Sequence, residues 1–103
     1  MPGYIADAEN GDSTASPSED GLFMMFQKLN HTDNTFVVVQ NDGEEQDWFA
    51  SVSLLDDGGY EVELRDARYR EHELTVQHDL GRIARDVTIW LTARYSATPP
   101  RDF

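Results

Sequence analysis

Apolar residues recur along this chain at two spacings, and each spacing predicts a type of element. Near the start, four of them fall on one helical face: Leu22, Met25, Phe26 and Leu29. Ser16-Pro17-Ser18-Glu19 precedes them and is typical of a helix start, with Ser16 as the N-cap and Glu19 completing a capping box. We therefore predict a helix that begins at Ser16 and ends near Asn30.

The middle of the chain changes to a period of two, which is typical of strands. Thr35–Gln40 is a β-branched run that is apolar on both faces, so we expect a central strand. Apolar and polar residues alternate in Asp47–Leu55 and again in Tyr60–Leu64. We predict that a polar connection at residues 41–46 and a turn at Asp56-Asp57-Gly58-Gly59 join these three strands.

Hydrophobic matching predicts the register of the second hairpin. A three-residue loop, Asp57-Gly58-Gly59, pairs Asp56 with Tyr60 and Leu54 with Val62. One buried face then holds Trp48, Ala50, Val52, Leu54, Tyr60, Val62 and Leu64. The outer face holds Phe49, Ser51, Ser53, Leu55, Glu61, Glu63 and Arg65.

The last third of the chain predicts one more strand and a second helix. Alternation around His72, Leu74 and Val76 indicates a fourth strand. After Asp79, a plausible N-cap, helical spacing recurs in Leu80, Ile83, Ala84, Val87, Trp90 and Leu91. We expect this helix to run to about Tyr95, with four charged residues outward: Arg82, Arg85, Asp86 and Arg94. The fold class is therefore α+β, an antiparallel sheet of three to four strands flanked by an N-terminal and a C-terminal helix.

Composition divides the 103 residues into one domain and two ends. Residues 1–15 are rich in Gly, Ser and Asp without periodicity, so we expect a flexible acidic leader. Residues 16–95 form the single α+β domain. Residues 96–103 form a C-terminal tail, because Pro99-Pro100 cannot continue a helix.

The formal net charge is −12 and is unevenly distributed. Leu29–Leu64 contains no Lys or Arg but nine acids: Asp33, Asp42, Glu44, Glu45, Asp47, Asp56, Asp57, Glu61 and Glu63. Residues 65–103 contain six acids and seven Arg. This charge argues against nucleic acid or an anionic membrane as a direct ligand, because both need a basic patch. It favours a cationic protein partner.

Residues that could support chemistry do not form a catalytic or metal-binding pattern. His72-Glu73 begins a zincin motif, but Val76 stands where the second His is needed. Paired carboxylates such as Glu61 and Glu63 are expected in turns or on the outer face, where both stay ionised and neither can act as a general acid. Because there are also no cysteines, we predict no enzymatic activity, no cofactor and no metal site.

The acidic stretch has two interpretations. A solvated acidic face improves solubility. Against that interpretation, acids without facing cations repel one another and cost stability, which favours a compensating use in partner binding. With Phe49 as an apolar anchor, the predicted partner-binding residues are Asp42, Glu44, Glu45, Asp47, Phe49, Asp56, Asp57, Glu61 and Glu63. Because the two acidic turns lie at opposite ends of the middle strand, either one end plus the outer face binds the partner, or part of this charge only serves solvation.

Within residues 20–95, a resemblance to a known family rests on Asn34–Val39, Val52-Ser53-Leu54, Gly59–Arg65, His72 and the closing helix Leu80–Leu91. In these features the chain resembles the small immunity proteins of bacterial polymorphic toxin systems, in particular those paired with cytosine-deaminase toxins. The resemblance implies a cytoplasmic protein that binds a cognate toxin domain and blocks its basic cleft. The alternative is an acidic interaction domain or nucleic-acid-mimicking regulator without a toxin partner.

Overall fold

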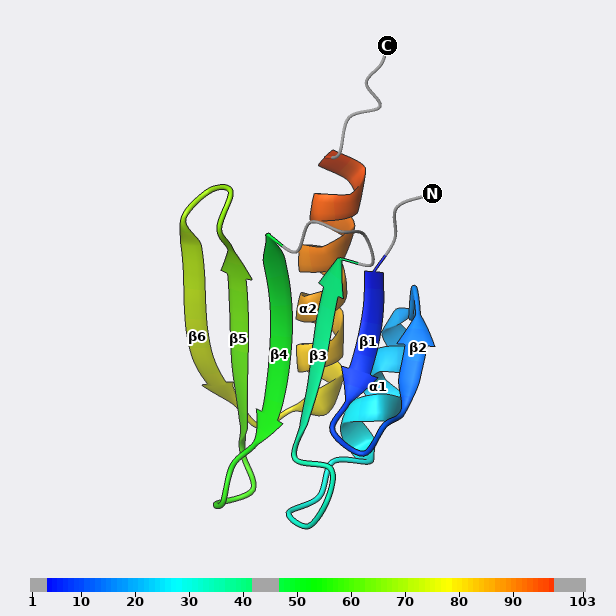
Figure 1. Ribbon diagram of the computed structural model, residues 1–103. Coiled ribbons are helices and arrows are strands. Elements are labelled where there is room, and N and C mark those ends of the chain that lie inside the picture. The colour runs from blue at the N-terminus through cyan, green and yellow to red at the C-terminus, as the bar shows by residue number, and fades with distance from the viewer. Residues whose placement is uncertain (1–3, 42–46, 98–103) are drawn as a thin grey trace.

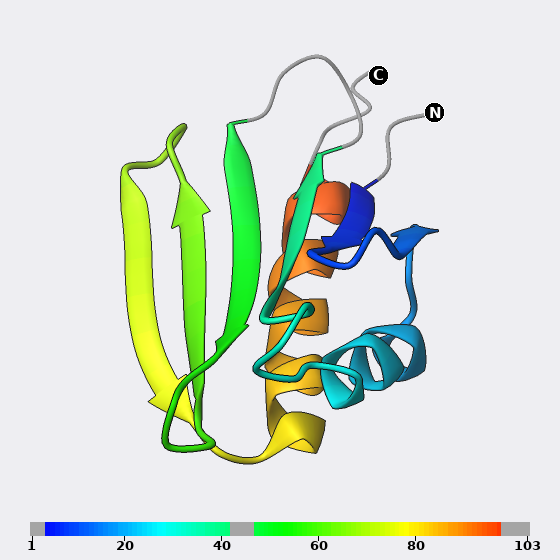
Figure 2. The same ribbon diagram turned by 60° about the horizontal axis from the view of Figure 1, so that its bottom comes forward.

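The computed structural model describes residues 4–41 and 47–97, in which two helices pack on one face of a six-stranded antiparallel sheet (Figures 1 and 2). The elements, in chain order, are β1 (Tyr4–Ala8), β2 (Ser13–Ala15), α1 (Glu19–Gln27), β3 (Phe36–Asn41), β4 (Trp48–Leu54), β5 (Tyr60–Asp66), β6 (Glu71–Gln77) and α2 (Leu80–Ala97). The strand order is β2-β1-β3-β4-β5-β6, so every strand from β3 to β6 pairs with its neighbour in sequence. The predicted α+β class is confirmed.

The predicted number of strands, three to four, is too small because residues 4–15 are not a flexible leader. They form β1 and β2, and β1 pairs with β3 from Tyr4↔Asn41 to Ala8↔Val37. The inward side chains of β1 are Ala6 and Ala8, which are buried under the helices. Alanines alternating with a polar residue give a weak periodic signal, and the pairing with β3 is distant in sequence, so the pattern alone did not indicate these strands.

The start of α1 also differs from its prediction. Ser18 is the N-cap, since its Oγ accepts a hydrogen bond from the backbone N–H of Gly21 at 3.1 Å. Ser16 instead has a φ of 46° and donates its N–H to the carbonyl of Tyr4 at 2.7 Å. Because Ser16 is held at the end of the β1–β2 hairpin, it cannot cap the helix, and the predicted capping box is wrong.

The β4–β5 hairpin keeps the predicted faces but not the predicted pairs. Leu54 pairs with Tyr60 and Val52 with Val62, a shift of two residues that leaves every side chain on its expected face. The loop still has three residues, 56–58, and Gly58 holds its left-handed position with a φ of 93°. The prediction placed that loop one residue later in the chain.

The core lies between the helices and the inner face of the sheet. Its largest fully buried apolar side chains are Phe26, Leu22, Ile83, Leu91, Val37, Val39, Val52 and Val87. Removing each from water contributes roughly 1.5–3 kcal/mol. Trp48 is buried as predicted, and its ring meets the half-buried ring of Trp90 edge to face, with centroids 5.8 Å apart.

A buried ion cluster attaches the C-terminal half of α2 to the β5–β6 turn. Asp66 has no exposed surface and accepts hydrogen bonds from Arg68 Nη2 at 2.9 Å and Arg94 Nε at 3.0 Å. Arg94 also pairs with Glu71 and lies 3.6 Å above the ring of Trp90. The prediction that Arg94 points outward is therefore wrong. Hydrogen bonds from Arg68 are the main cause that keeps the pKa of Asp66 below its usual value.

The helix α2 continues to Ala97, two residues past the predicted end. The rest of the predicted tail, residues 98–103, lies outside the described residues.

Candidate partner-binding surface

The face of the sheet opposite the helices, here called the open face, is turned toward the viewer in Figure 1. No described helix covers it. The pairing register orders its side chains into three rows across the strands. The row nearest the β4–β5 turn is Phe36, Ser53, Glu61 and Val76. The middle row is Asp7, Val38, Ser51, Glu63 and Leu74, and the third is Ile5, Gln40, Phe49, Arg65 and His72.

One end of the sheet gathers most of the described acidic connections. Because successive strands are antiparallel, the connections at residues 9–12, 28–35, 55–59 and 78–79 all lie at the lower end in Figure 1. Lys28 is the single Lys or Arg in these four connections. They carry six acids, and we call them the acidic end: Glu9, Asp12, Asp33, Asp56, Asp57 and Asp79.

Hydrogen bonds between the connections fix this acidic end in shape. Glu9 Oε1 accepts from the backbone N–H and the hydroxyl of Thr35 at 2.7 and 2.6 Å. The side-chain bond is the larger cause of a lowered pKa at Glu9, so this carboxylate stays ionised at neutral pH. The Nε2 of His31 lies 2.9 Å from the carbonyl oxygen of Leu55, which joins the α1–β3 connection to the β4–β5 turn.

The turn at residues 56–58 is itself braced. Asp57 Oδ1 accepts from the N–H of Gly59 at 3.0 Å, and the N–H of Leu55 donates to the carbonyl of Gly59 at 2.8 Å. The side chains of Asp56 and Asp57 are exposed. Two carboxylates are therefore presented to solvent on a short, fixed turn.

The opposite end of the sheet has a different charge. The β5–β6 connection at residues 67–70 contains Arg68 and Arg70 and no acid. Arg65, in the third row of the open face, pairs across the strands with Phe49. The half-buried Asp47 lies at this end, where its carbonyl accepts from the N–H of Ala67 at 2.8 Å.

The structure divides the predicted partner-binding residues into separate groups. Asp56, Asp57 and Glu61 lie together at the acidic end and in the row that adjoins it. Glu63 lies in the middle row, with its Oε2 2.8 Å from Nε2 of His72. Asp47 and Phe49 belong to the opposite end, and Asp42, Glu44 and Glu45 lie outside the described residues.

Three residues that the sequence did not single out lie at the acidic end or in the row that adjoins it. Asp33 belongs to the α1–β3 connection. Phe36 and Val76 are the two ends of the first row of the open face and are 37% and 56% exposed. Asp33 was visible as part of the acidic stretch, but its position depends on the contact between His31 and the β4–β5 turn. The sequence predicted a strand at Val76 but did not indicate that the sheet face on which Val76 lies is uncovered.

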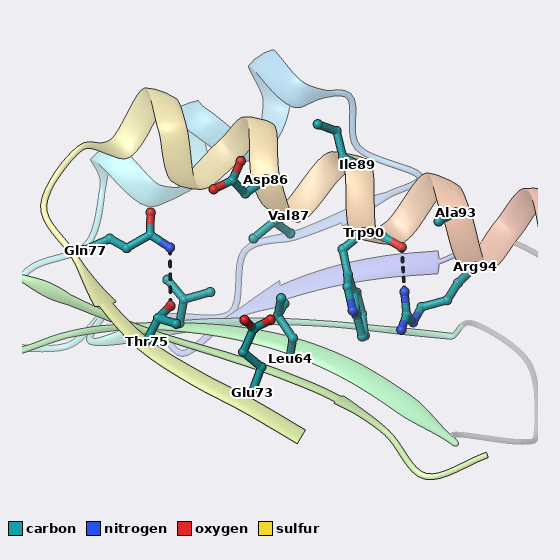
Figure 3. A pocket seen from close by; sticks show the side chains of 11 residues that line it. Leu64, Glu73, Thr75, Gln77, Asp86, Val87, Ile89, Trp90, Ala93 and Arg94 are labelled. Atoms are coloured by element: carbon teal, nitrogen blue, oxygen red, sulfur yellow. Dashed lines mark hydrogen bonds between the residues drawn. The ribbon is translucent and has the colours of Figure 1, made fainter. Parts of the chain in front are cut away.

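A groove of about 430 Å³ lies on the other face, between α2 and the inner side of β5 and β6 (Figure 3). Val62, Leu64 and Val87 form its apolar lining, and Glu73 and Asp86 lie on its opposite walls. The ionisable groups of α2 around it already have partners: Asp86 faces Arg82 and Arg85 at 3.9 and 3.8 Å, and Arg94 belongs to the Asp66 cluster. The arrangement is that of an amphipathic cleft and does not bring a nucleophile next to a base.

Comparison with protein-family models gives no match, and comparisons with curated proteins and with solved structures give none either. Among the residues with described positions, no helix is both long and apolar enough to cross a membrane. Within the same ranges, no group of three or more His, Asp or Glu side chains is arranged to hold a metal ion.

Proposed function

We propose that this protein is a cytoplasmic immunity protein that binds and neutralises a nucleic-acid-targeting bacterial toxin of the deaminase type. It does so without catalysis, by placing its acidic end and the adjoining row of the open face against the basic cleft of the toxin. The observation that carries the proposal is the continuity of the six acids of the acidic end with two exposed apolar side chains, Phe36 and Val76.

Electrostatics gives this surface a way to find its partner. A toxin that acts on nucleic acid binds phosphates through clustered Lys and Arg, and a deaminase must also leave its cleft open to an extruded base. Six carboxylates on braced connections attract such a cleft at long range and raise the association rate. They need no reordering on contact, because hydrogen bonds already hold the connections of Glu9 and Asp57.

Apolar contact gives the same surface a way to hold its partner. Glu61 lies between Ser53 and Val76 in the first row, and Phe36 is at the other side of Ser53. An apolar anchor surrounded by contacts that exclude water is the usual anatomy of an energetically dominant contact. The predicted anchor Phe49 lies four residues before Ser53 in β4, about 13 Å from this row.

A matched pair of double variants tests the electrostatic part. Asp56→Asn with Asp57→Asn removes two charges from the acidic end, and the amide oxygen introduced at the second position can still accept from the N–H of Gly59. Glu73→Gln with Asp86→Asn removes two charges from the groove on the other face. With the toxin domain encoded beside this gene, we expect the first double variant to slow association about tenfold at low salt and the second to leave it nearly unchanged.

Two results would contradict the proposal. One is an association rate that does not change with ionic strength; the other is equal slowing by both double variants. The alternative, a nucleic-acid-mimicking regulator without a toxin partner, predicts that the protein binds several unrelated basic proteins and does not rescue cells that co-express the neighbouring toxin. Rescue by co-expression without such general binding supports the immunity function.

A further inference from the structure

The strand β6 forms one edge of the sheet, at the left in Figure 1, and no described strand pairs with its outer side. Natural sheets protect such edges with short strands, prolines, charged side chains or bulges. β6 has seven residues without Pro or Lys, and its pairing with β5 runs without a bulge from Tyr60↔Gln77 to Asp66↔Glu71. The other edge, β2, has only three residues, so among the described strands only β6 offers a long ladder, and its protecting charges are Glu71 and Glu73.

The apolar side chains of this edge also lie on the uncovered side. Leu74 and Val76 are 55% and 56% exposed on the open face, while Glu73 and Thr75 point to the helix side. This polarity is the reverse of that in β4 and β5, whose apolar residues face the helices. A lateral neighbour that continues the sheet would cover Leu74 and Val76 from the side.

We propose that β6 pairs with β6 of a second copy of this chain, antiparallel about a two-fold axis at Leu74, which joins the two sheets into one. This self-association goes beyond the toxin-binding function. It leaves Phe36, Asp56 and Asp57 uncovered, whereas Val76 and Asp79 lie at the seam between the two copies.

The charges along β6 select this register. Centred on Leu74, the pairing places Glu73 opposite Thr75, His72 opposite Val76 and Glu71 opposite Gln77, so no like charges meet. A centre at Glu73 would set that residue against its own copy, and a centre at Thr75 would set Glu71 against Asp79. Like charges directly opposite each other destabilise strand pairs. The register at Leu74 also uses all seven residues of the strand.

The charges at the two ends of the sheet complement each other in the same arrangement. A two-fold axis at Leu74 reverses the second sheet, so the acidic end of each copy adjoins the β5–β6 connection of the other. Continuing the register by two pairs brings Asp79 beside the Tyr69–Arg70 turn of the second copy. Arg70 is exposed. The edge also lies in residues 65–103, which carry seven Arg and six acids, while the whole chain carries −12.

The seam between two such strands is a small interface, so we expect a weak dimer. Long-range repulsion between two copies of charge −12 falls when salt screens it. Sedimentation velocity of the full chain, from about 10 µM to about 1 mM, is therefore expected to show a dimer that tightens as salt rises. A monomer at every protein and salt concentration would overturn the proposal. The outer edge of β6 would then be expected to pair with a strand of another protein. Toxin binding is expected to weaken with salt, so the two proposals can fail separately.

Opposite substitutions at one position test the register. Thr75→Lys places a cation opposite Glu73 twice per dimer and is expected to tighten the dissociation constant roughly fivefold. Thr75→Glu places like charges there and is expected to weaken it by a similar factor. Circular dichroism confirms that each variant monomer is folded, since Thr75 accepts a bond from Gln77 at 3.3 Å (Figure 3). Equal effects of the two substitutions would overturn the register.

Two charge reversals of equal size test the contact between the ends. Arg70→Glu and Arg85→Glu change the net charge by the same amount, but only Arg70 adjoins Asp79 of the second copy. Arg85 lies on α2 and faces Asp86 at 3.8 Å. We expect Arg70→Glu to weaken the dimer several-fold more than Arg85→Glu. Equal weakening would show that net charge alone acts, and would overturn this contact.

Discussion

At the scale of single residues, the ion cluster of Asp66, Arg68 and Arg94 explains how the longer helix is positioned. A carboxylate with no exposed surface is stable there only because two guanidinium groups bond to it. The cluster could not be predicted from sequence, because Arg94 falls on the polar side of the helical spacing and its partners are 23 to 28 residues away. Its side chain turns back across the ring of Trp90 instead.

Replacing Arg94 tests whether this cluster stabilises the fold. Arg94→Met keeps an unbranched side chain above Trp90 and removes the charge, so Asp66 retains only Arg68. We expect a loss of about 2 kcal/mol in the free energy of unfolding, below the cost of leaving a buried charge fully unpaired. Urea unfolding at neutral pH measures it. Arg85→Met is the control, because its side chain is 57% exposed and should change stability by less than about 0.5 kcal/mol. Equal effects would contradict a structural role for the cluster.

At the scale of elements, periodicity predicted what depends on neighbours in sequence. The helices α1 and α2 and the strands β4 to β6 were predicted because each has an apolar period, and β3 was predicted because it is a β-branched apolar run. β1 and β2 were not, since Ala6 and Ala8 are weakly apolar and their partner strand is about 30 residues away. The predicted position of the β4–β5 loop was one residue too late. Gly58 and Gly59 both suit a left-handed position, and the sequence does not distinguish them.

Substituting each of the two glycines by alanine distinguishes the observed loop at residues 56–58 from the predicted loop at residues 57–59. Gly58→Ala places a Cβ at a φ of 93°, and we expect it to cost about 1–2 kcal/mol of unfolding free energy. Gly59→Ala brings its Cβ to 2.9 Å from Nε2 of His78, an exposed side chain that can move, so a smaller loss is expected. Denaturant unfolding of the two variants checks the order. A larger loss at Gly59 would favour the predicted loop over residues 57–59.

At the scale of the whole molecule, strand direction decides which acids act together. The sequence indicated one long anionic stretch and predicted that its two acidic turns lie at opposite ends of the middle strand, because antiparallel strands send successive connections to alternate ends. Asp56 and Asp57 therefore join Asp33 and Glu9, while Asp47 lies beside the Arg-containing connection at residues 67–70. The charge of the candidate surface was predictable from sequence. Which other acids join Asp56 and Asp57 on that surface was not predictable, because this depends on the register and on the contact between His31 and Leu55.

The acidic end should also destabilise the free protein, because its six carboxylates repel one another across short connections. Removing two of them by Asp56→Asn with Asp57→Asn is then expected to raise the free energy of unfolding by a few tenths of a kcal/mol at low salt. The gain should shrink at high salt, where ions screen the repulsion. Urea unfolding at two salt concentrations measures both. Glu73→Gln with Asp86→Asn is the control and should give no gain, since Asp86 loses the contacts with Arg82 and Arg85. If Asp56→Asn with Asp57→Asn makes the protein more stable but slows association, the charge is retained for binding. If it lowers stability at every salt concentration, the two carboxylates stabilise the fold and the expectation is wrong.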